Sequence, residues 1–147
     1  MLSKQTSSLN TEIPLVLLDT HIAIWMTQGN PRLKKREALL QAAYEQEKLF
    51  LSAISAWEIG MLATKGRIDL PASPQQWFAE FVSKFSIQVI DVTADIALHS
   101  SFMLNKIHGD PADRIIVATC HKHDALLLTA DKQILSWSKG LIDTLSI

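Results

Sequence analysis

Short apolar runs alternate along the chain with longer segments in which apolar residues recur at helical spacing. The runs indicate buried strands, and the recurrence every three or four residues indicates helices. The predicted strands are residues 15–18, 48–51, 87–90 and 126–129, with 142–145 as a candidate last strand. The predicted helices are residues 20–27, 32–46, 53–64, 74–85, 93–104, 110–123 and 131–137. Strands that alternate with helices predict a mainly parallel sheet covered on both faces, which is a three-layer α/β/α sandwich.

Turn and capping residues support several of these boundaries. Ser73 suits the N-cap of a helix whose first residue is Pro74, and Gly66 closes the helix before it. Residues 1–13 are rich in Ser, Thr and Asn and are predicted to be a loose N-terminal tail. Residues 14–147 contain no repeat, linker or low-complexity tract, so we expect them to form one domain.

Composition narrows the class of protein. The chain has 147 residues, enough for one domain that buries roughly 68–70% of its unfolded surface. Its longest apolar run is only a few residues, so we expect no membrane span, and its polar start does not resemble a signal peptide. The single cysteine, Cys120, excludes an intrachain disulfide and suits a reducing cytoplasm. The net charge of −1 gives no bulk attraction to nucleic acid, so local basic residues or a metal ion would have to supply it.

Four carboxylates stand where such a fold would bring them together. Asp19 and Asp131 follow predicted strands, and the functional crevice of a parallel α/β sheet lies at the carboxyl ends of its strands. Glu58 shares a helical face with Ile54, which is apolar, and Asp113 opens another apolar helical stripe. Two acids on inward-facing stripes beside two acids at strand ends predict a shared acidic pocket.

Each of these acids also has a structural interpretation. Asp19 and Asp131 could be helix N-caps, and Asp113 lies at capping-box spacing after Asp110. Glu58 could pair with Lys65, or it could face solvent if other residues of its helix define the buried side. Hydroxyl residues beside the acids could bind the carboxylates or act as caps themselves: Thr20, Ser52, Ser55 and Thr129.

An acidic pocket of this kind implies a cation. Carboxylates about 4 Å apart repel by about 4 kcal/mol per pair at an effective dielectric constant of about 20. Hard oxygen ligands select Mg²⁺ or Mn²⁺, which suits cleavage of phosphodiesters. Cys120, His121 and His123 spread around one helix and do not predict zinc, and Cys120 with His21 lacks a third group to orient a nucleophile. No glycine-rich phosphate loop follows the first strand.

In order along the chain, these segments resemble the PIN domain, and within it the toxin half of bacterial VapBC toxin–antitoxin pairs. The matching motifs are DTHIAIW (19–25), SAISAWEI (52–59), KGRI (65–68), HGDPADRIIVA (108–118) and LLTAD (127–131). The resemblance implies a PIN-like fold with Asp19, Glu58, Asp113 and Asp131 as catalytic and metal-binding residues. Asp110, often acidic in this branch, would be a cap or an outer ligand. This chain departs from many relatives in having Leu62 where they carry Lys, and Lys65 is the possible substitute.

The resemblance also implies a Mg²⁺- or Mn²⁺-dependent endoribonuclease that is inhibited by a cognate antitoxin and forms a homodimer. Its RNA would be unpaired or splayed, because single strands expose their bases and backbone. Candidate phosphate contacts are Lys65, Arg67, Arg114 and Lys132. Two alternatives stay open: another Mg²⁺-dependent phosphoesterase with Asp19 as nucleophile, and a non-catalytic binding module that docks an Arg of a partner. The phosphoesterase would need a second acid two residues after Asp19, where the chain has His21.

Overall fold

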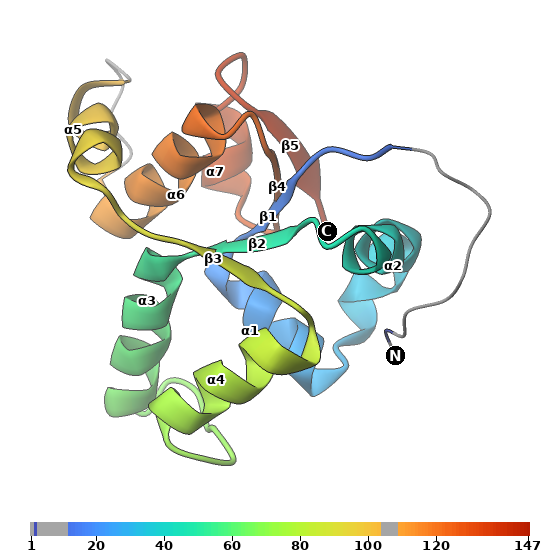
Figure 1. Ribbon diagram of the computed structural model, residues 1–147. Coiled ribbons are helices and arrows are strands. Elements are labelled where there is room, and N and C mark those ends of the chain that lie inside the picture. Colours follow the sequence, from blue (N-terminus) through green and yellow to red (C-terminus); the bar gives the residue numbers. More distant parts are fainter. Residues whose placement is uncertain (1, 3–11, 104–108) are drawn as a thin grey trace.

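The computed structural model describes residues 2, 12–103 and 109–147, so most of the predicted tail and His108 lie outside the described residues. Its centre is a five-stranded sheet in the order β3-β2-β1-β4-β5, in which every neighbouring pair is parallel (Figure 1). The strands are β1 (Val16–Leu18), β2 (Leu49–Ser52), β3 (Gln88–Ile90), β4 (Leu126–Thr129) and β5 (Asp143–Ser146). The predicted parallel sheet is confirmed, and the candidate last strand is part of it.

Helices cover both faces of the sheet, which confirms the three-layer sandwich. In Figure 1, α5 (Ala94–Phe102), α6 (Pro111–Lys122) and α7 (Lys132–Trp137) lie on one face. The other face carries α1 (Thr20–Gln28), α2 (Glu37–Glu45), α3 (Ala53–Thr64) and α4 (Pro74–Lys84). The order of the strands places β1 at the middle of the sheet, so the loop after β1 lies beside the loop after β4.

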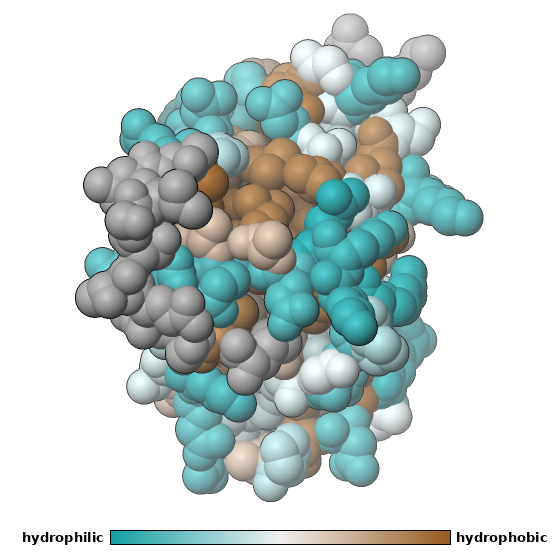
Figure 2. All heavy atoms as spheres, turned by 90° about the vertical axis from the view of Figure 1, so that its right-hand side faces the viewer, coloured by the Kyte–Doolittle hydropathy of each residue, from teal (hydrophilic) through white to brown (hydrophobic). Residues whose placement is uncertain are grey.

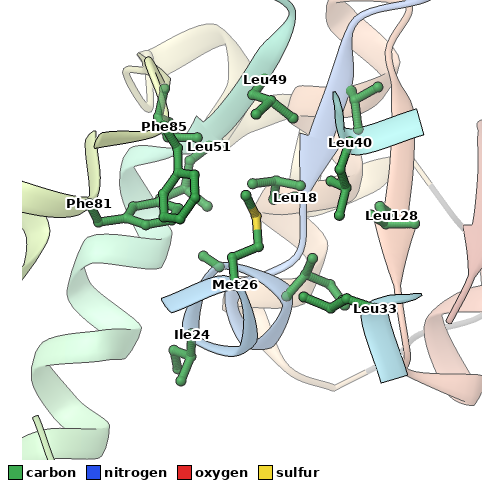
Figure 3. Close-up of a cluster of buried hydrophobic side chains, with 14 of the residues drawn as sticks. Leu18, Ile24, Met26, Leu33, Leu40, Leu49, Leu51, Phe81, Phe85 and Leu128 are labelled. Carbon is green, nitrogen blue, oxygen red and sulfur yellow. The ribbon is translucent and has the colours of Figure 1, made fainter. Parts of the chain in front are cut away.

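The alternation of side chains along β1 divides the core into two parts. Val16 and Leu18 belong to the larger cluster, with α1, α2 and α4, whereas Leu17 belongs to the cluster under α6 and α7. In the close-up of Figure 3, the side chains of Leu18 and Met26 lie at the centre of the larger cluster, with Phe81 and Phe85 on one side and Leu33 and Leu40 on the other. Successive residues of a strand point to opposite faces, so a strand buried on both sides must be continuously apolar.

One predicted helix is divided in two. Residues 32–46 form a 3-10 helix, η1 (Pro31–Arg36), followed by α2. The side chain of Asn30 accepts a hydrogen bond from the Arg32 N–H, and Pro31 stands at the first helical position. The capping residues predicted for other helices are confirmed: Ser73 caps α4, and Gly66, after α3, has a φ of +67°.

The Cys120–His123 segment does not gather a metal site among the described residues. Cys120 is buried and donates its thiol to the Ala125 carbonyl oxygen, and burial raises the pKa of this thiol to about 12. The His121 ring contacts the His99 ring of α5, with 2.9 Å between Nδ1 and Nε2. Lys122 forms an ion pair with Asp95.

No helix in the described parts of the chain has the length and apolar character that crossing a bilayer requires.

Candidate active site

The first part of the site lies where β1 and β4 end. Asp19 follows β1, is only 6% exposed, and accepts hydrogen bonds from the Thr20 N–H (2.8 Å) and the Thr129 hydroxyl (2.6 Å). The hydroxyl oxygen of Thr129, at the end of β4, in turn accepts a hydrogen bond from the Asp131 N–H (3.0 Å). The Thr129 hydroxyl therefore fixes the position of Asp19 and links it to Asp131.

Helix α3 contributes Glu58 from the side. The Thr20 hydroxyl donates to Glu58 Oε1 at 2.6 Å and lies 2.9 Å from the Ser55 hydroxyl. Glu58 is half-buried, whereas the preceding Trp57 is 59% exposed. Glu58 therefore faces the end of the sheet and contacts Thr20, and neither the Lys65 ion pair nor the fully solvated position is observed.

The start of α6 completes the site. Glu58, Asp110 and Asp113 each offer a carboxylate oxygen, and these oxygens all lie within 4.8 Å of one another. The acids line one cleft of about 320 Å³ together with Asp19 and Asp131. The structure thus brings the four predicted acids together and adds Asp110, which sequence analysis treated as a cap or an outer ligand.

Capping and participation in the cleft are compatible roles for these acids. Asp19, Asp110 and Asp131 are the N-caps of α1, α6 and α7, as the structural interpretation expected. The caps of α6 and α7 each use a single carboxylate oxygen, Oδ1. Because a carboxylate has two oxygens and several lone pairs, a capping Asp can still bind a cation.

Burial and mutual repulsion raise the pKa values of two acids in this cleft. Desolvation raises the pKa of Asp19, although the hydrogen bonds from Thr129 and Thr20 oppose the shift. Desolvation also raises the pKa of Glu58 to about 7, and the negative charges of Asp113, Asp19 and Asp110 add to the shift while the Thr20 hydroxyl opposes it. A divalent cation would favour the charged form of both carboxylates and would displace the proton that Glu58 holds below about pH 7.

The raised pKa of Glu58 predicts a pH dependence of the metal-free protein. Folding raises this pKa from 4.5 to about 7, so the folded state binds the proton more tightly than the unfolded state. The contribution of Glu58 to stability therefore falls as the pH rises from about 4.5 to about 7. In EDTA, the melting temperature of Glu58→Gln minus that of the wild type should grow between pH 5 and pH 8. A difference that stays constant over this range would contradict the shift.

The predicted phosphate contacts do not line this cleft. Arg114 donates from Nε and Nη2 to the carbonyl oxygens of Ser100 and Ser101 at the end of α5. Lys65 and Arg67 are exposed after α3, and Lys132 is exposed at the start of α7. Their role in substrate binding stays a prediction.

Besides Ala130, three residues that sequence analysis did not assign to the site also line the cleft: His21, Trp25 and Arg32. His21 and Trp25 are one turn apart on α1, with ring centroids 6.5 Å apart. The guanidinium carbon of Arg32 lies 4.4 Å from the centroid of the Trp25 ring. The i, i+4 spacing of His21 and Trp25 after Asp19 was the available signal, but the position of Arg32 depends on the turn at residues 29–31.

Comparison with known proteins agrees with this geometry. Residues 16–138 match the sequence model of the PIN domain family. The chain is also 32% identical over 121 residues to Ribonuclease VapC22 of Mycobacterium tuberculosis, an alignment that covers 82% of this chain and 90% of that protein. This chain is a PIN-domain protein of the VapC family. The predicted family resemblance is thereby confirmed.

Solved structures share the PIN fold of this chain. The VapBC2 complex of Rickettsia felis, bound to a DNA fragment from its promoter, superposes with a TM-score of 0.66 at 16% identity, covering 89% of this chain and 97% of that chain. A toxin–antitoxin complex of Klebsiella pneumoniae gives a TM-score of 0.64 at 21% identity, covering 89% of this chain and 96% of that chain. At these identities the superpositions establish the fold.

Proposed function

We propose that this VapC-family protein is a divalent-metal-dependent endoribonuclease and the toxin of a type II toxin–antitoxin pair. The observation that carries the proposal is the convergence of the Glu58, Asp110 and Asp113 carboxylates beside Asp19 and Asp131 in one open cleft. The identity to a protein named a ribonuclease supports RNA as the substrate. We place the protein in the cytoplasm, where RNA is abundant.

The residues present suit Mg²⁺ or Mn²⁺, since they offer only carboxylate oxygens at the point of convergence. Asp19 and Asp113 would hold the ion directly, with Glu58 and Asp131 beside them and Asp110 as a further ligand or cap. When bound, the ion would polarise the scissile phosphate and lower the pKa of the attacking water.

The remaining contributions come from the chain itself. Thr20 and Thr129 hold Asp19 in one orientation, so this carboxylate needs no rearrangement when the site is loaded. The Thr20 hydroxyl holds Glu58 at the same time, which fixes the position of Glu58 relative to Asp19. Glu58, whose pKa is about 7 in the metal-free protein, would lose its proton when the ion binds.

Metal binding should stabilise the fold. Mn²⁺ at about 100 times its dissociation constant should add about 2.7 kcal/mol to the free energy of unfolding. Differential scanning fluorimetry and calorimetric titration would measure the melting temperature and the heat of binding. Asp113→Asn should lose most of this stabilisation, whereas Asp95→Asn, which alters an exposed acid paired with Lys122, should retain it. An unchanged melting temperature in millimolar Mn²⁺, together with no heat of binding, would rule out the metal site.

We propose a VapB-like antitoxin as the protein partner. The solved neighbours are toxin–antitoxin complexes, which supports such a partner here. An acidic cleft is blocked effectively by an inserted Arg, because a guanidinium pairs with carboxylates through two parallel hydrogen bonds. A peptide of the antitoxin that carries this Arg should therefore compete with Mn²⁺ for the cleft, and simultaneous binding of both would contradict this mode of inhibition.

We also propose that the protein is a homodimer. Large apolar side chains are exposed on α3 and α5: Trp57 at 59%, Leu98 at 64% and Phe102 at 67%. A dimer interface over α3 and α5 would cover these side chains, which are otherwise in contact with water. Analytical ultracentrifugation should give a dimer for the wild type and a lower association constant for Phe102→Asp. A wild type that is monomeric at micromolar concentration would contradict the dimer.

A further inference from the structure

The acidic cleft must admit a polyanion, and one Arg stands at its wall. Among the residues that the structure describes, five carboxylates line the cleft, and Arg32 is the only Arg or Lys there. A bound metal ion would offset part of the negative charge, but the phosphates on either side of the reacting one would still meet acids. Phosphate contacts from Arg and Lys position a nucleic-acid strand, so a cation at the wall of this cleft is well placed for that task.

The backbone around Arg32 is fixed by three consecutive features. Gly29 ends α1 with a φ of +61°, a conformation that glycine adopts without steric cost. Asn30 then caps η1 through its hydrogen bond to the Arg32 N–H (2.9 Å). Pro31, at the first position of η1, restricts φ by its ring. The Cα of Arg32 is therefore held in place although its side chain is exposed.

The side chain of Arg32 is also oriented. Its guanidinium carbon lies 4.4 Å from the centroid of the Trp25 ring, and Trp25 is half-buried and packs against the larger core cluster. The guanidinium is planar and carries five N–H donors in that plane, and its contact with the Trp25 ring restricts the positions that it adopts. This geometry suits a phosphate, which accepts two parallel hydrogen bonds from one guanidinium.

We propose that Arg32, held over Trp25, binds a phosphate of the RNA backbone next to the scissile one. The inference rests on the proposed ribonuclease function and names the group that guides the strand into the cleft. Because the contact is to phosphate rather than to a base, it should affect RNAs of different sequence alike. Trp25 is then a positioning residue, since it acts through Arg32.

The test is steady-state cleavage of a fluorogenic single-stranded RNA in Mn²⁺. Arg32→Ala should raise KM about 10- to 100-fold, in line with the loss of a charge-assisted hydrogen bond, and leave kcat unchanged. The slope of log KM against log salt should become smaller by about 0.7. Arg32→Lys should restore part of the loss, because it keeps the charge but not the planar group. Trp25→Phe should stay near the wild type, and Trp25→Leu should raise KM.

The matched control is Lys84→Ala, which removes an exposed cation at the end of α4. The Nζ atom of Lys84 also lies over an aromatic ring, 5.4 Å from the centroid of Phe85. This variant should leave KM and its salt dependence unchanged. The Mn²⁺ affinity of Arg32→Ala should be equal to or tighter than that of the wild type, because a positive charge near the acids has been removed. A higher KM would then not result from loss of the metal.

The outcomes separate this inference from the proposed function. Equal KM values and salt slopes for Arg32→Ala and Lys84→Ala would overturn the role of Arg32 while leaving the nuclease intact. The role would also be overturned if Arg32→Ala weakened only the complex with a protein inhibitor. If the wild type cleaves no RNA, the proposed function fails. Fluorescence anisotropy with a labelled single-stranded RNA then tests Arg32 by itself, and unchanged affinity in Arg32→Ala would overturn the inference.

Discussion

Replacing Asp113 by Asn should reduce metal-dependent RNA cleavage at least about 100-fold, since loss of even an outer-shell partner of a metal costs about 10- to 100-fold. The same substitution should leave the metal-free protein as stable as the wild type or more stable. Asp113 offers an oxygen within 4.8 Å of those of Glu58 and Asp110, and removing one charge relieves repulsion among them. Initial rates in Mn²⁺ and the melting temperature in EDTA measure the two effects.

A substitution at Asp19 should affect folding as well as function. Both oxygens of Asp19 accept hydrogen bonds, and its donor Thr129 already accepts one from the Asp131 N–H. An Asn at position 19 has only one side-chain oxygen, so one of these buried hydrogen bonds would be lost. We therefore expect Asp19→Asn to lower stability as well as activity. If Asp113→Asn unfolds the protein or leaves cleavage unchanged, the acid is a structural residue and the metal site is wrong.

Expression of this chain alone in a bacterial host should arrest growth. An endoribonuclease that is not inhibited degrades the RNA of its own cell, so a cognate inhibitor is needed. Co-expression of the protein encoded by the neighbouring gene should restore growth, and the Asp113→Asn variant should be harmless by itself. Growth curves after induction, with protein levels matched by immunoblot, measure the effect.

The variant controls for the burden of overexpression, because it differs from the wild type by one group in the cleft. A wild type that is expressed at a high level and does not slow growth would remove the toxin assignment. The metal site could still be present in that case, and the non-catalytic binding module would become the better interpretation.

The sheet and the acidic cleft could be predicted because they depend on short-range patterns. A strand buried on both faces must be continuously apolar, so residues such as Leu15–Leu18 reveal it directly. Parallel strands end at one edge, which places Asp19 near Asp131 once both follow strands. The positions of Glu58 and Asp113 were predicted from helical periodicity, because Glu58 interrupts one apolar helical stripe and Asp113 begins another.

Other features depend on geometry that no local pattern specifies. Residues 32–46 divide into η1 and α2 at Arg36, whose φ of −112° and ψ of 8° are not helical, and apolar spacing does not show this break. η1 itself begins at the turn that Asn30 caps. The same turn brings Arg32 over Trp25, which sequence analysis missed. Arg114 was a candidate phosphate contact, but its guanidinium donates to the carbonyl oxygens of Ser100 and Ser101 near the end of α5.

The most direct test of the central claim is the rate at which the purified, EDTA-stripped protein cleaves single-stranded RNA as Mn²⁺ is added back. The convergence of five carboxylates in one cleft predicts no cleavage without the ion and a saturable rise in rate with its concentration. Cleavage that continues in EDTA, or a protein that stays inactive on single-stranded RNA at every Mn²⁺ concentration, would contradict it.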